Sequence, residues 1–392
     1  MDNTWWTAFI WIALALMASL VSMRLALSVA LAEILFGVLG GNLLHIQPTS
    51  WINFLASLGG VLLTFLAGAE IDPEAMRRYW KPAVAIGAVS FLLPFLSATA
   101  CAYYLAGWNA DASKVAGIAL SDTSVAVVYA MMVETGMNRT ALGKLTLSAC
   151  FATGLGSMGA LGLFFARVNV WLMVFVLALA GTMAFAPRLT RWFLRAVNAH
   201  LSEPQVKLML MMLMMLGTLA VKARSEAVLG AYLLGLALAG TLAHQRDLMH
   251  RLRLLTFTLL TPFYFLRAGS YVSVPALWQS VGWISVLLIL KVMTKVVGCY
   301  PLCRAFRLPK RESAYVTLLM STGLTFGTIA AMFGLTNGYI TQSQYTMLVA
   351  VIIGSALAPT VIAQMFLKPA IEVEMIAHSA TQQRARLVQE EA

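Results

Sequence analysis

Residues 117–126 read GIALSDTSVA, which places four consecutive polar side chains, Ser121 to Ser124, in the middle of an apolar segment. Serine, threonine and aspartate side chains compete with a helix for backbone hydrogen bonds, so such a cluster favours a break. After the polar cluster, from Val125 onward, the segment is again apolar and contains no glycine up to residue 134. We therefore expect the helix over residues 115–134 to be interrupted, with Asp122 inside the break.

A second stretch has the same character. Residues 318–327 read LLMSTGLTFG, in which Ser321, Thr322 and Thr325 lie around a glycine in an equally apolar segment. Glycine loosens a helix further because it loses the most backbone freedom on folding. The pattern predicts a second interrupted helix over residues 312–335.

The composition indicates a polytopic membrane protein. Of the 392 residues, 60% are hydrophobic and 11% are charged, which leaves too few charges to cover a soluble protein of this length. We predict an all-α membrane domain over residues 1–368 and a short polar tail over 369–392. The apolar runs predict about thirteen membrane helices, over residues 5–23, 27–44, 51–69, 82–106, 115–134, 140–166, 168–186, 206–222, 226–243, 252–275, 281–303, 312–335 and 343–367.

The two interrupted helices are seven apart in the chain, so they cross the membrane in opposite directions. Paired interruptions in the two halves of a chain are typical of transporters built from an inverted repeat, with the binding site at the breaks. The alternative is a pair of ordinary helices whose hydroxyl groups bond back to the preceding turn. The symmetrical placement favours the inverted repeat.

Basic residues predict the orientation. Of the 27 Lys and Arg residues, nineteen lie in the tail or in loops after odd-numbered helices, and four lie in loops after even-numbered helices. By the positive-inside rule the C-terminus is cytoplasmic and the N-terminus is outside. Residues 187–203 carry arginines beside Trp192 and Phe193, which predicts an amphipathic helix on the membrane surface.

Several function classes are excluded at this point. The net charge of +11 comes largely from short loops between apolar segments, so it does not indicate a nucleic-acid partner. The four cysteines form no C-x-x-C pair and the five histidines do not cluster, so we expect no cofactor and no resident metal. A membrane-embedded serine enzyme is disfavoured because no histidine lies within a core helix to activate a nucleophile.

Charged residues inside the helices mark the candidate site, since an ionisable group in the bilayer is costly unless paired or hydrated. Asp122 lies in the first break. Lys295 lies midway along the eleventh helix, and Lys291 lies one turn earlier on the same face. A lysine beside an aspartate can release its proton when a cation arrives. The alternative for Lys295 is a salt bridge that joins two helices.

Other charged residues are weaker candidates. Glu33 in the second helix, with Glu70 and Asp72 at the end of the third, would line a vestibule, although a hydrogen bond at the helix end is the favoured account of Glu70 and Asp72. For Arg267 in the tenth helix we favour a structural role over a functional one. Lys144 lies near a helix end, where its side chain can reach the membrane surface.

Four motifs carry a resemblance to a known family. They are residues 59–72 (GGVLLTFLAGAEID), 120–126 (LSDTSVA), 295–298 (KVVG) and 319–327 (LMSTGLTFG). In this order and spacing, from about residue 27 to 369, the chain resembles the monovalent cation:proton antiporter family, the branch of sodium/proton and potassium/proton exchangers that includes the Kef-type proteins.

The resemblance implies a thirteen-helix fold with a dimerisation panel and a core. In the core, over about residues 82–166 and 252–335, two broken helices cross and carry the ion by an elevator-type movement. It implies a homodimer in the lipid of a bacterial inner membrane. It further implies that Lys295 matches the core lysine of the family, and that Thr123 and Ser124 match its first break.

The sequence departs from the family in helix six, where members usually carry one or two acidic residues. Residues 150–156 read CFATGLG, so Thr153 and Gly154 occupy the acidic positions. Three explanations remain open. Asp122 has taken over as the titrating carboxylate; the chain is an inactive or engineered form whose acid was removed; or the protein moves an anion or a neutral solute, with Lys295 left as a positive site.

The leading hypothesis is exchange of Na⁺ or K⁺ for H⁺ through Asp122 and Lys295. Hard cations prefer oxygen ligands, and the neutral oxygens expected to serve are those of Ser121, Thr123, Ser124, Thr153, Ser321, Thr322 and Thr325. The rivals are a carrier of the same fold for an anion or small solute, and a membrane sensor that transports nothing.

Overall fold

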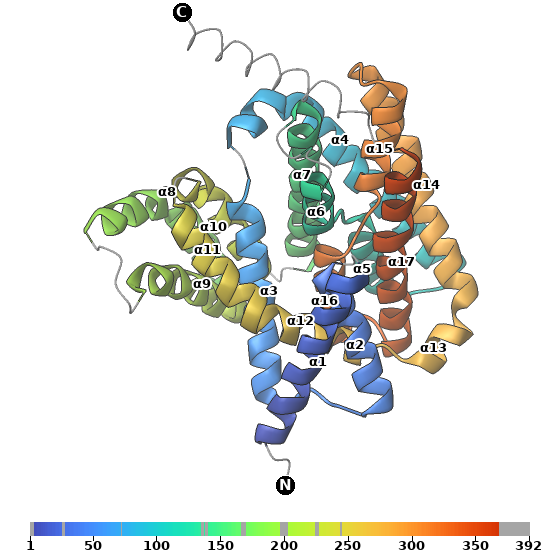
Figure 1. Ribbon diagram of the computed structural model, residues 1–392, viewed down its shortest axis with the longest axis horizontal. Helices are drawn as coiled ribbons and strands as arrows, with labels where there is room; N and C mark the ends of the chain where they lie inside the picture. The colour runs from blue at the N-terminus through green and yellow to red at the C-terminus, as the bar shows by residue number, and fades with distance from the viewer. Residues whose placement is uncertain are drawn as a thin grey trace, which may run out of the picture.

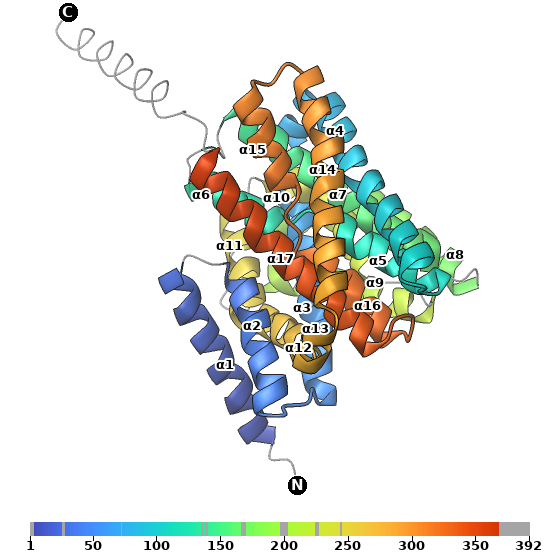
Figure 2. The same ribbon diagram turned by 90° about the vertical axis from the view of Figure 1, so that its right-hand side faces the viewer.

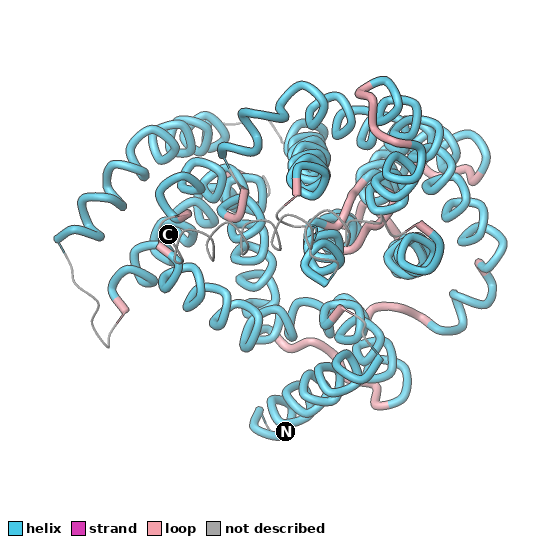
Figure 3. Tube along the Cα trace, turned by 45° about the horizontal axis from the view of Figure 1, so that its top comes forward, coloured by secondary structure: helices cyan, strands magenta, loops and turns pink. Residues whose placement is uncertain are grey.

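The computed structural model of the chain describes residues 4–25, 28–71, 73–134, 137, 140–165, 170–196, 203–223, 227–243 and 245–367. This part of the chain is built from helices joined by short loops and contains no strand (Figure 3). The tail predicted over residues 369–392 lies outside the described residues, as does Asp72.

The first half of the chain forms eight α-helices and one π-helical segment. They are α1 (Thr4–Leu25), α2 (Val29–Leu43), α3 (Ser50–Ala69), α4 (Pro73–Ala100), η1 (Cys101–Leu105), α5 (Ala110–Ser121), α6 (Val125–Glu134), α7 (Ala141–Phe165) and α8 (Val170–Ala196).

The second half continues the series with the same kind of elements. They are α9 (Pro204–Lys222), α10 (Ala227–Leu242), α11 (Arg246–Leu255), η3 (Thr256–Leu260), α12 (Thr261–Ser270), α13 (Val274–Gln279), α14 (Val281–Ala305), α15 (Lys310–Met320), α16 (Thr325–Thr336) and α17 (Gln342–Phe366).

The described helices can be compared with the thirteen membrane segments expected from the sequence. Nine stretches of the described chain are long and apolar enough to cross a membrane, and one of them is the pair α15–α16. The two shorter apolar helices α2 and α10 correspond to two more of the expected segments, and the remaining two expected ranges fall on α5–α6 and on α11–η3–α12.

Two helices differ from their predicted extents, and proline is involved in both. The surface helix expected over residues 187–203 is wrong as a separate element: α8 continues through Pro187 to Ala196, and residues 197–202 lie outside the described part. Membrane helices tolerate proline where the local backbone adjusts. Helix α4 begins nine residues earlier than predicted, at Pro73, and kinks at Tyr79 (φ −107°, ψ 17°), just before Pro82.

One group of helices is held together by close backbone contacts through glycine. Helix α10 packs on α3, where Gly68 faces the Tyr232 carbonyl and Gly235 faces the Phe65 carbonyl so closely that a Cβ atom at either glycine would collide with backbone. Helix α12 packs on α2 in the same way. Helices α8, α9 and α11 lie beside this group in Figure 1.

A second group surrounds the two breaks. Helix α4 packs on α5, α7 and α14; α5 packs on α16; and α14 packs on α15 and α17. Figure 2 shows α14 between α4 and α17, with α15 beside the upper part of α14. Segments from both halves of the chain therefore enclose the region that the sequence marks as the candidate site.

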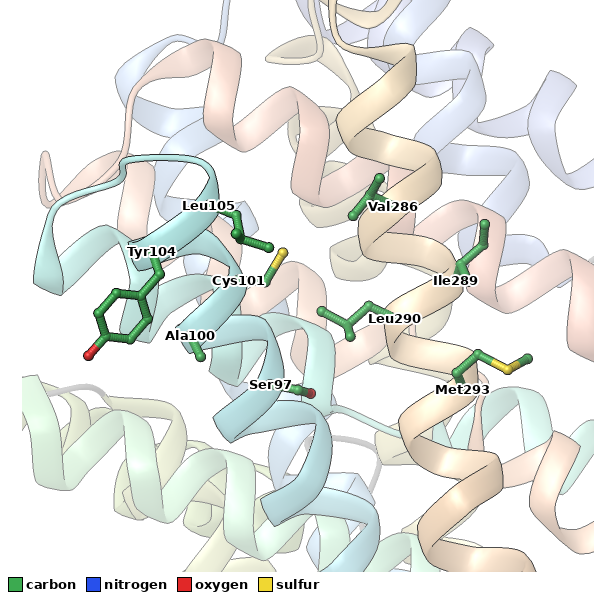
Figure 4. A pocket seen from close by; sticks show the side chains of 9 residues that line it. All are labelled: Ser97, Ala100, Cys101, Tyr104, Leu105, Val286, Ile289, Leu290 and Met293. Atoms are coloured by element: carbon green, nitrogen blue, oxygen red, sulfur yellow. The ribbon is translucent and has the colours of Figure 1, made fainter.

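An apolar groove of about 700 Å³ lies on the outer side of this second group, between α14 and the α4–η1 segment (Figure 4). Its lining is Ser97, Ala100, Cys101, Tyr104, Leu105, Val286, Ile289, Leu290 and Met293. The Ser97 hydroxyl donates to the Leu93 carbonyl of its own helix. The described residues that line the groove carry no charged side chain.

Candidate functional site

Both predicted helix breaks are present. Helix α5 ends at Ser121 and α6 begins at Val125, with Asp122 in an extended conformation between them (φ −57°, ψ 150°). Helix α15 ends at Met320 and α16 begins at Thr325. The polar side chains of both breaks are buried, and those from Ser121 to Ser124 have no exposed surface.

The two breaks touch and satisfy each other's backbone groups. The Ser124 backbone N–H donates to the Thr322 carbonyl over 2.9 Å. The Thr123 hydroxyl donates to the Met320 carbonyl at the end of α15, over 2.7 Å. The last carbonyls of a helix have no partner within it, so the first break supplies hydrogen-bond donors to the carbonyls at the end of α15 and in the second break.

Asp122 binds the start of the other broken helix with one of its two carboxylate oxygens. Oδ2 accepts a hydrogen bond of 2.9 Å from the Gly327 backbone N–H, in the first turn of α16. A carboxylate is stabilised there by the exposed N–H groups and the positive end of the helix dipole. The Leu324 backbone N–H also acts on this carboxylate, but in the described part of the chain Oδ1 has no partner within hydrogen-bond distance and is fully buried. One half of the carboxylate is therefore fixed and the other half is free.

Lys295 is held at the end of α5. Its Nζ donates to the Ser121 carbonyl (2.7 Å) and to the hydroxyls of Ser90 and Thr123 (2.8 Å each). The Asp122 backbone carbonyl lies 3.4 Å away. The ammonium thus offsets the negative end of the α5 dipole and ties α14 to α4 and α5. Among the described residues it forms no direct ion pair with the Asp122 carboxylate.

Lys291 has a different environment, although it lies one turn from Lys295. Its side chain is 1% exposed, and its Nζ has no hydrogen-bond partner among the residues that the structure describes. The amine lies against Gly323 of the second break, in the space that a Cβ atom would need. The charged groups that act on it are Lys295, which repels it, and Asp122, which attracts it.

Most predicted hydroxyl ligands use their protons within their own helix. Ser121 donates to the Ile118 carbonyl, Ser321 to the Thr317 carbonyl and Thr322 to the Leu319 carbonyl. Their oxygen atoms keep lone pairs for another partner. Thr325 is the first residue of α16 and is 7% exposed.

Helix α7 carries the two predicted residues that stand at the acidic positions. The Thr153 hydroxyl donates to the Ala149 carbonyl over 3.0 Å and lies 3.3 Å from the Gly87 carbonyl of α4. Gly154 faces the ring of Phe326, whose nearest carbon would lie 2.7 Å from an added Cβ atom. An apolar ring of α16 therefore occupies the space next to Gly154.

Two residues that contribute to this region were not predicted from the sequence. Ser90 of α4 accepts a hydrogen bond from Lys295. Tyr232 of α10 packs edge-on against Phe326, with 5.7 Å between ring centroids, and donates its hydroxyl proton to the Phe151 carbonyl over 3.0 Å. An isolated serine in a long apolar helix is the only sequence signal that points to Ser90.

The weaker candidates are not at the crossing of the breaks. Glu33 is buried on α2, which packs on α1 and α12. Arg267 of α12 lies with its guanidinium 5.8 Å from the Tyr271 ring centroid. Glu70 pairs with Arg253 over 2.8 Å, and both line a cavity of about 220 Å³ together with Lys144. Asp72 lies outside the described residues.

Comparison with known proteins agrees with this architecture. The family model described as sodium/hydrogen exchanger, transmembrane, matches residues 12–368. The chain is 24% identical over 351 residues to the probable Na⁺/H⁺ antiporter 3 of Methanocaldococcus jannaschii, which covers 86% of this chain and 89% of that protein. It is 23% identical over 369 residues to the Na⁺/H⁺ antiporter of Enterococcus hirae, with 89% and 94% covered.

A solved structure supports the same conclusion about the fold. The sodium proton antiporter MjNhaP1 from Methanocaldococcus jannaschii is similar with a TM-score of 0.66 and 14% sequence identity, and the match covers 91% of this chain and 94% of that one. The family match extends over nearly the whole membrane domain. The chain therefore belongs to the sodium/hydrogen exchanger family of membrane transporters.

Proposed function

We propose that this protein exchanges a monovalent cation, Na⁺ or K⁺, for H⁺, and that Asp122 is the carboxylate at which the cation binds. The observation that carries the proposal is the free Oδ1 of Asp122, which is buried without a partner where the two breaks meet. A buried carboxylate oxygen left unpaired is costly. A bound cation or a proton would remove that cost.

The surrounding oxygens suit a small hard cation. Such ions take carboxylate, carbonyl and hydroxyl oxygens as ligands. The hydroxyl oxygens of Ser121, Ser321 and Thr322 present lone pairs because their protons point to their own helices. A cation would bind at the free oxygen of Asp122, and the proton given up in exchange would leave an ionisable group of the same buried region.

The movement that completes the exchange is proposed from the family resemblance and the packing. The helices around the breaks would move as one body against the group formed by α2, α3, α10 and α12, which carries the glycine contacts described above. Charge counting supports a cytoplasmic C-terminus. A homodimer in a bacterial inner membrane follows from the resemblance alone.

The rival function is transport of an anion or small solute, and one observation favours it. The crossing region contains two buried lysines, Lys291 and Lys295, and one carboxylate, Asp122. With all three groups ionised the region is positively charged, which suits an anion better than a cation. The experiment must therefore distinguish the sign of the transported ion.

The test uses purified protein in liposomes with an internal acid load and a pH-sensitive dye. Pulses of Na⁺, K⁺ and Li⁺ are compared with choline in the wild type and in Asp122→Asn. The matched control is Asp111→Asn, because Asp111 is a half-exposed carboxylate paired with Lys114 over 3.0 Å. We expect cation-driven proton efflux in the wild type and in Asp111→Asn, and its loss in Asp122→Asn.

Two results would contradict the proposal. Efflux that survives in Asp122→Asn would remove Asp122 from the exchange. Absence of any cation-driven efflux in the wild type, together with currents that follow an imposed anion gradient, would establish the rival.

A further inference from the structure

We propose that Lys291, and not Lys295, carries the exchanged proton. The inference rests on the proposed function and deepens it by naming the second ionisable group of the site. It assigns different roles to two lysines that lie one turn apart on the same helix: Lys295 is structural, and Lys291 carries the proton.

Lys295 has a structural role, because all of its hydrogen-bond donors are in use. An ammonium group has three protons to donate, and the Lys295 Nζ has three acceptors within 2.8 Å, which are the Ser121 carbonyl and the hydroxyls of Ser90 and Thr123. Release of a proton would break one of these bonds and weaken the tie between α14, α4 and α5. The group is therefore poorly suited to repeated protonation and deprotonation.

Lys291 lacks the hydrogen bonds that hold Lys295. It is as buried as Lys295, yet its Nζ has no hydrogen-bond partner among the described residues. The Oδ1 atom of Asp122 also lacks a partner. The two charges attract each other but form no direct ion pair in the described structure. The crossing thus holds one free buried nitrogen and one free buried carboxylate oxygen, of opposite charge.

These two atoms define a simple exchange. Without a cation, the protonated Lys291 balances the ionised Asp122. When Na⁺ or K⁺ binds at Oδ1, the Lys291 ammonium is left beside two positive charges, the cation and Lys295, and loses its proton to water. Loss of the cation lets the amine take up a proton again. No other bond changes, and one proton leaves for each cation that binds.

The charge of the site is then the same in both states. Asp122 contributes one negative charge and Lys295 one positive charge throughout. The remaining positive charge is carried either by Lys291 or by the cation. The proposal therefore requires exchange of one cation for one proton with no net charge moved.

Gly323 explains why the second break leaves room for this amine. A Cβ atom at this position would collide with the Lys291 Nζ and would lie 3.2 Å from the Asp122 carbonyl. The glycine in LLMSTGLTFG thus provides the space in which Nζ lies, next to the backbone of the first break.

The experiment measures binding of radioactive sodium to the purified full-length protein as a function of pH, and proton coupling in liposomes. Lys291→Gln removes the proton, and Lys291→Arg keeps a permanent positive charge. Lys295→Gln tests the neighbouring lysine, and Lys114→Gln is the control at a surface lysine. Lys291→Met is a second uncharged variant of similar length, and thermal unfolding reports whether each variant is folded.

We expect Lys291→Gln and Lys291→Met to bind Na⁺ and to lose the competition by protons, except in the acidic range where a carboxylate itself is protonated. We expect Lys291→Arg to bind Na⁺ at least about tenfold more weakly, as expected from a fixed charge near the carboxylate. Wild-type exchange should be insensitive to an imposed membrane potential.

The outcomes separate this inference from the proposed function. If the wild type binds no Na⁺ or K⁺, both are wrong. If the wild type binds, Asp122→Asn does not, and the Lys291 variants keep the wild-type pH dependence, the proposed function stands and the role of Lys291 is wrong. The role of Lys291 is also wrong if Lys295→Gln alone abolishes the competition by protons.

Discussion

The two helix breaks have related shapes but different chemistry. The first, between α5 and α6, carries the Asp122 carboxylate and has its carbonyl end bound by Lys295. The second, between α15 and α16, carries no charge of its own, and the hydroxyls of Ser321 and Thr322 bond to their own helix. It contributes the Gly327 N–H to Asp122 and the space at Gly323 to Lys291.

The difference shows how an inverted repeat can be symmetrical in backbone and asymmetrical in charge. The first break provides the carboxylate, and the second provides helix-end dipoles and room. Side-chain substitutions in and around the first break should therefore change both stability and transport. Equivalent substitutions in the second break should change less.

The largest expected effect separates the two lysines that serve the two breaks. Lys295→Met leaves one buried carbonyl and two hydroxyls without their partner, so we expect the free energy of unfolding to fall by about 3 kcal/mol or more. Lys291→Met breaks no hydrogen bond, and we expect a change within about 1 kcal/mol. Thermal or denaturant unfolding in detergent measures both. Equal losses would show that the Lys295 contacts do not stabilise the fold.

A smaller effect is expected where α16 meets α7. Gly154→Ala places a Cβ atom 2.7 Å from the Phe326 ring, and overpacking of this kind costs about 1–3 kcal/mol. We expect Phe326→Leu to recover most of the loss in the double variant. Unfolding of the four proteins of the cycle gives the coupling. An additive cycle would mean that the Phe326 ring moves aside at no cost in free energy of unfolding. Gly154→Asp would then be the next variant, to test a carboxylate at this position.

The smallest effect compares equivalent threonines in the two breaks. Thr123→Val removes the donor to the Met320 carbonyl and an acceptor of Lys295, which should cost about 1–3 kcal/mol. Thr322→Val removes one bond within its own helix and should cost about 1 kcal/mol or less. The serine variants of both keep the hydroxyl and serve as controls. A larger loss for Thr322→Val would reverse the assignment of roles to the two breaks.

The positions of the breaks could be predicted because the competing residues act locally. Ser121 to Ser124 and the stretch around Gly323 disturb the helix in which they lie, whatever packs against them. The number of membrane segments follows from the length of each apolar run. The family resemblance added the expectation that the two breaks cross, and the structure agrees.

The contacts that distinguish the two lysines could not be predicted in this way. Lys291 and Lys295 share a helix face in the sequence, and their environments differ only because Ser90 and the Ser121 carbonyl come from helices distant in the chain. Gly154 likewise indicates space without revealing that Phe326 fills it. Continuation of α8 past Pro187 depends on whether the surroundings accommodate a proline, which its own sequence does not state.

The glycine contacts between α3 and α10 have a mechanical consequence. Because Gly68 and Gly235 bring the two backbones together, sliding one helix along the other would force a side chain into a carbonyl group. Helices α3 and α10 therefore behave as one rigid pair. The Tyr232 hydroxyl links this helix pair to α7 by its hydrogen bond to the Phe151 carbonyl. If α7 moved along this pair, that link would break, and a bond worth about 1 kcal/mol shifts the ratio of two positions about fivefold. The Tyr232 bond would then favour one position of α7 and still be weak enough for thermal motion to break.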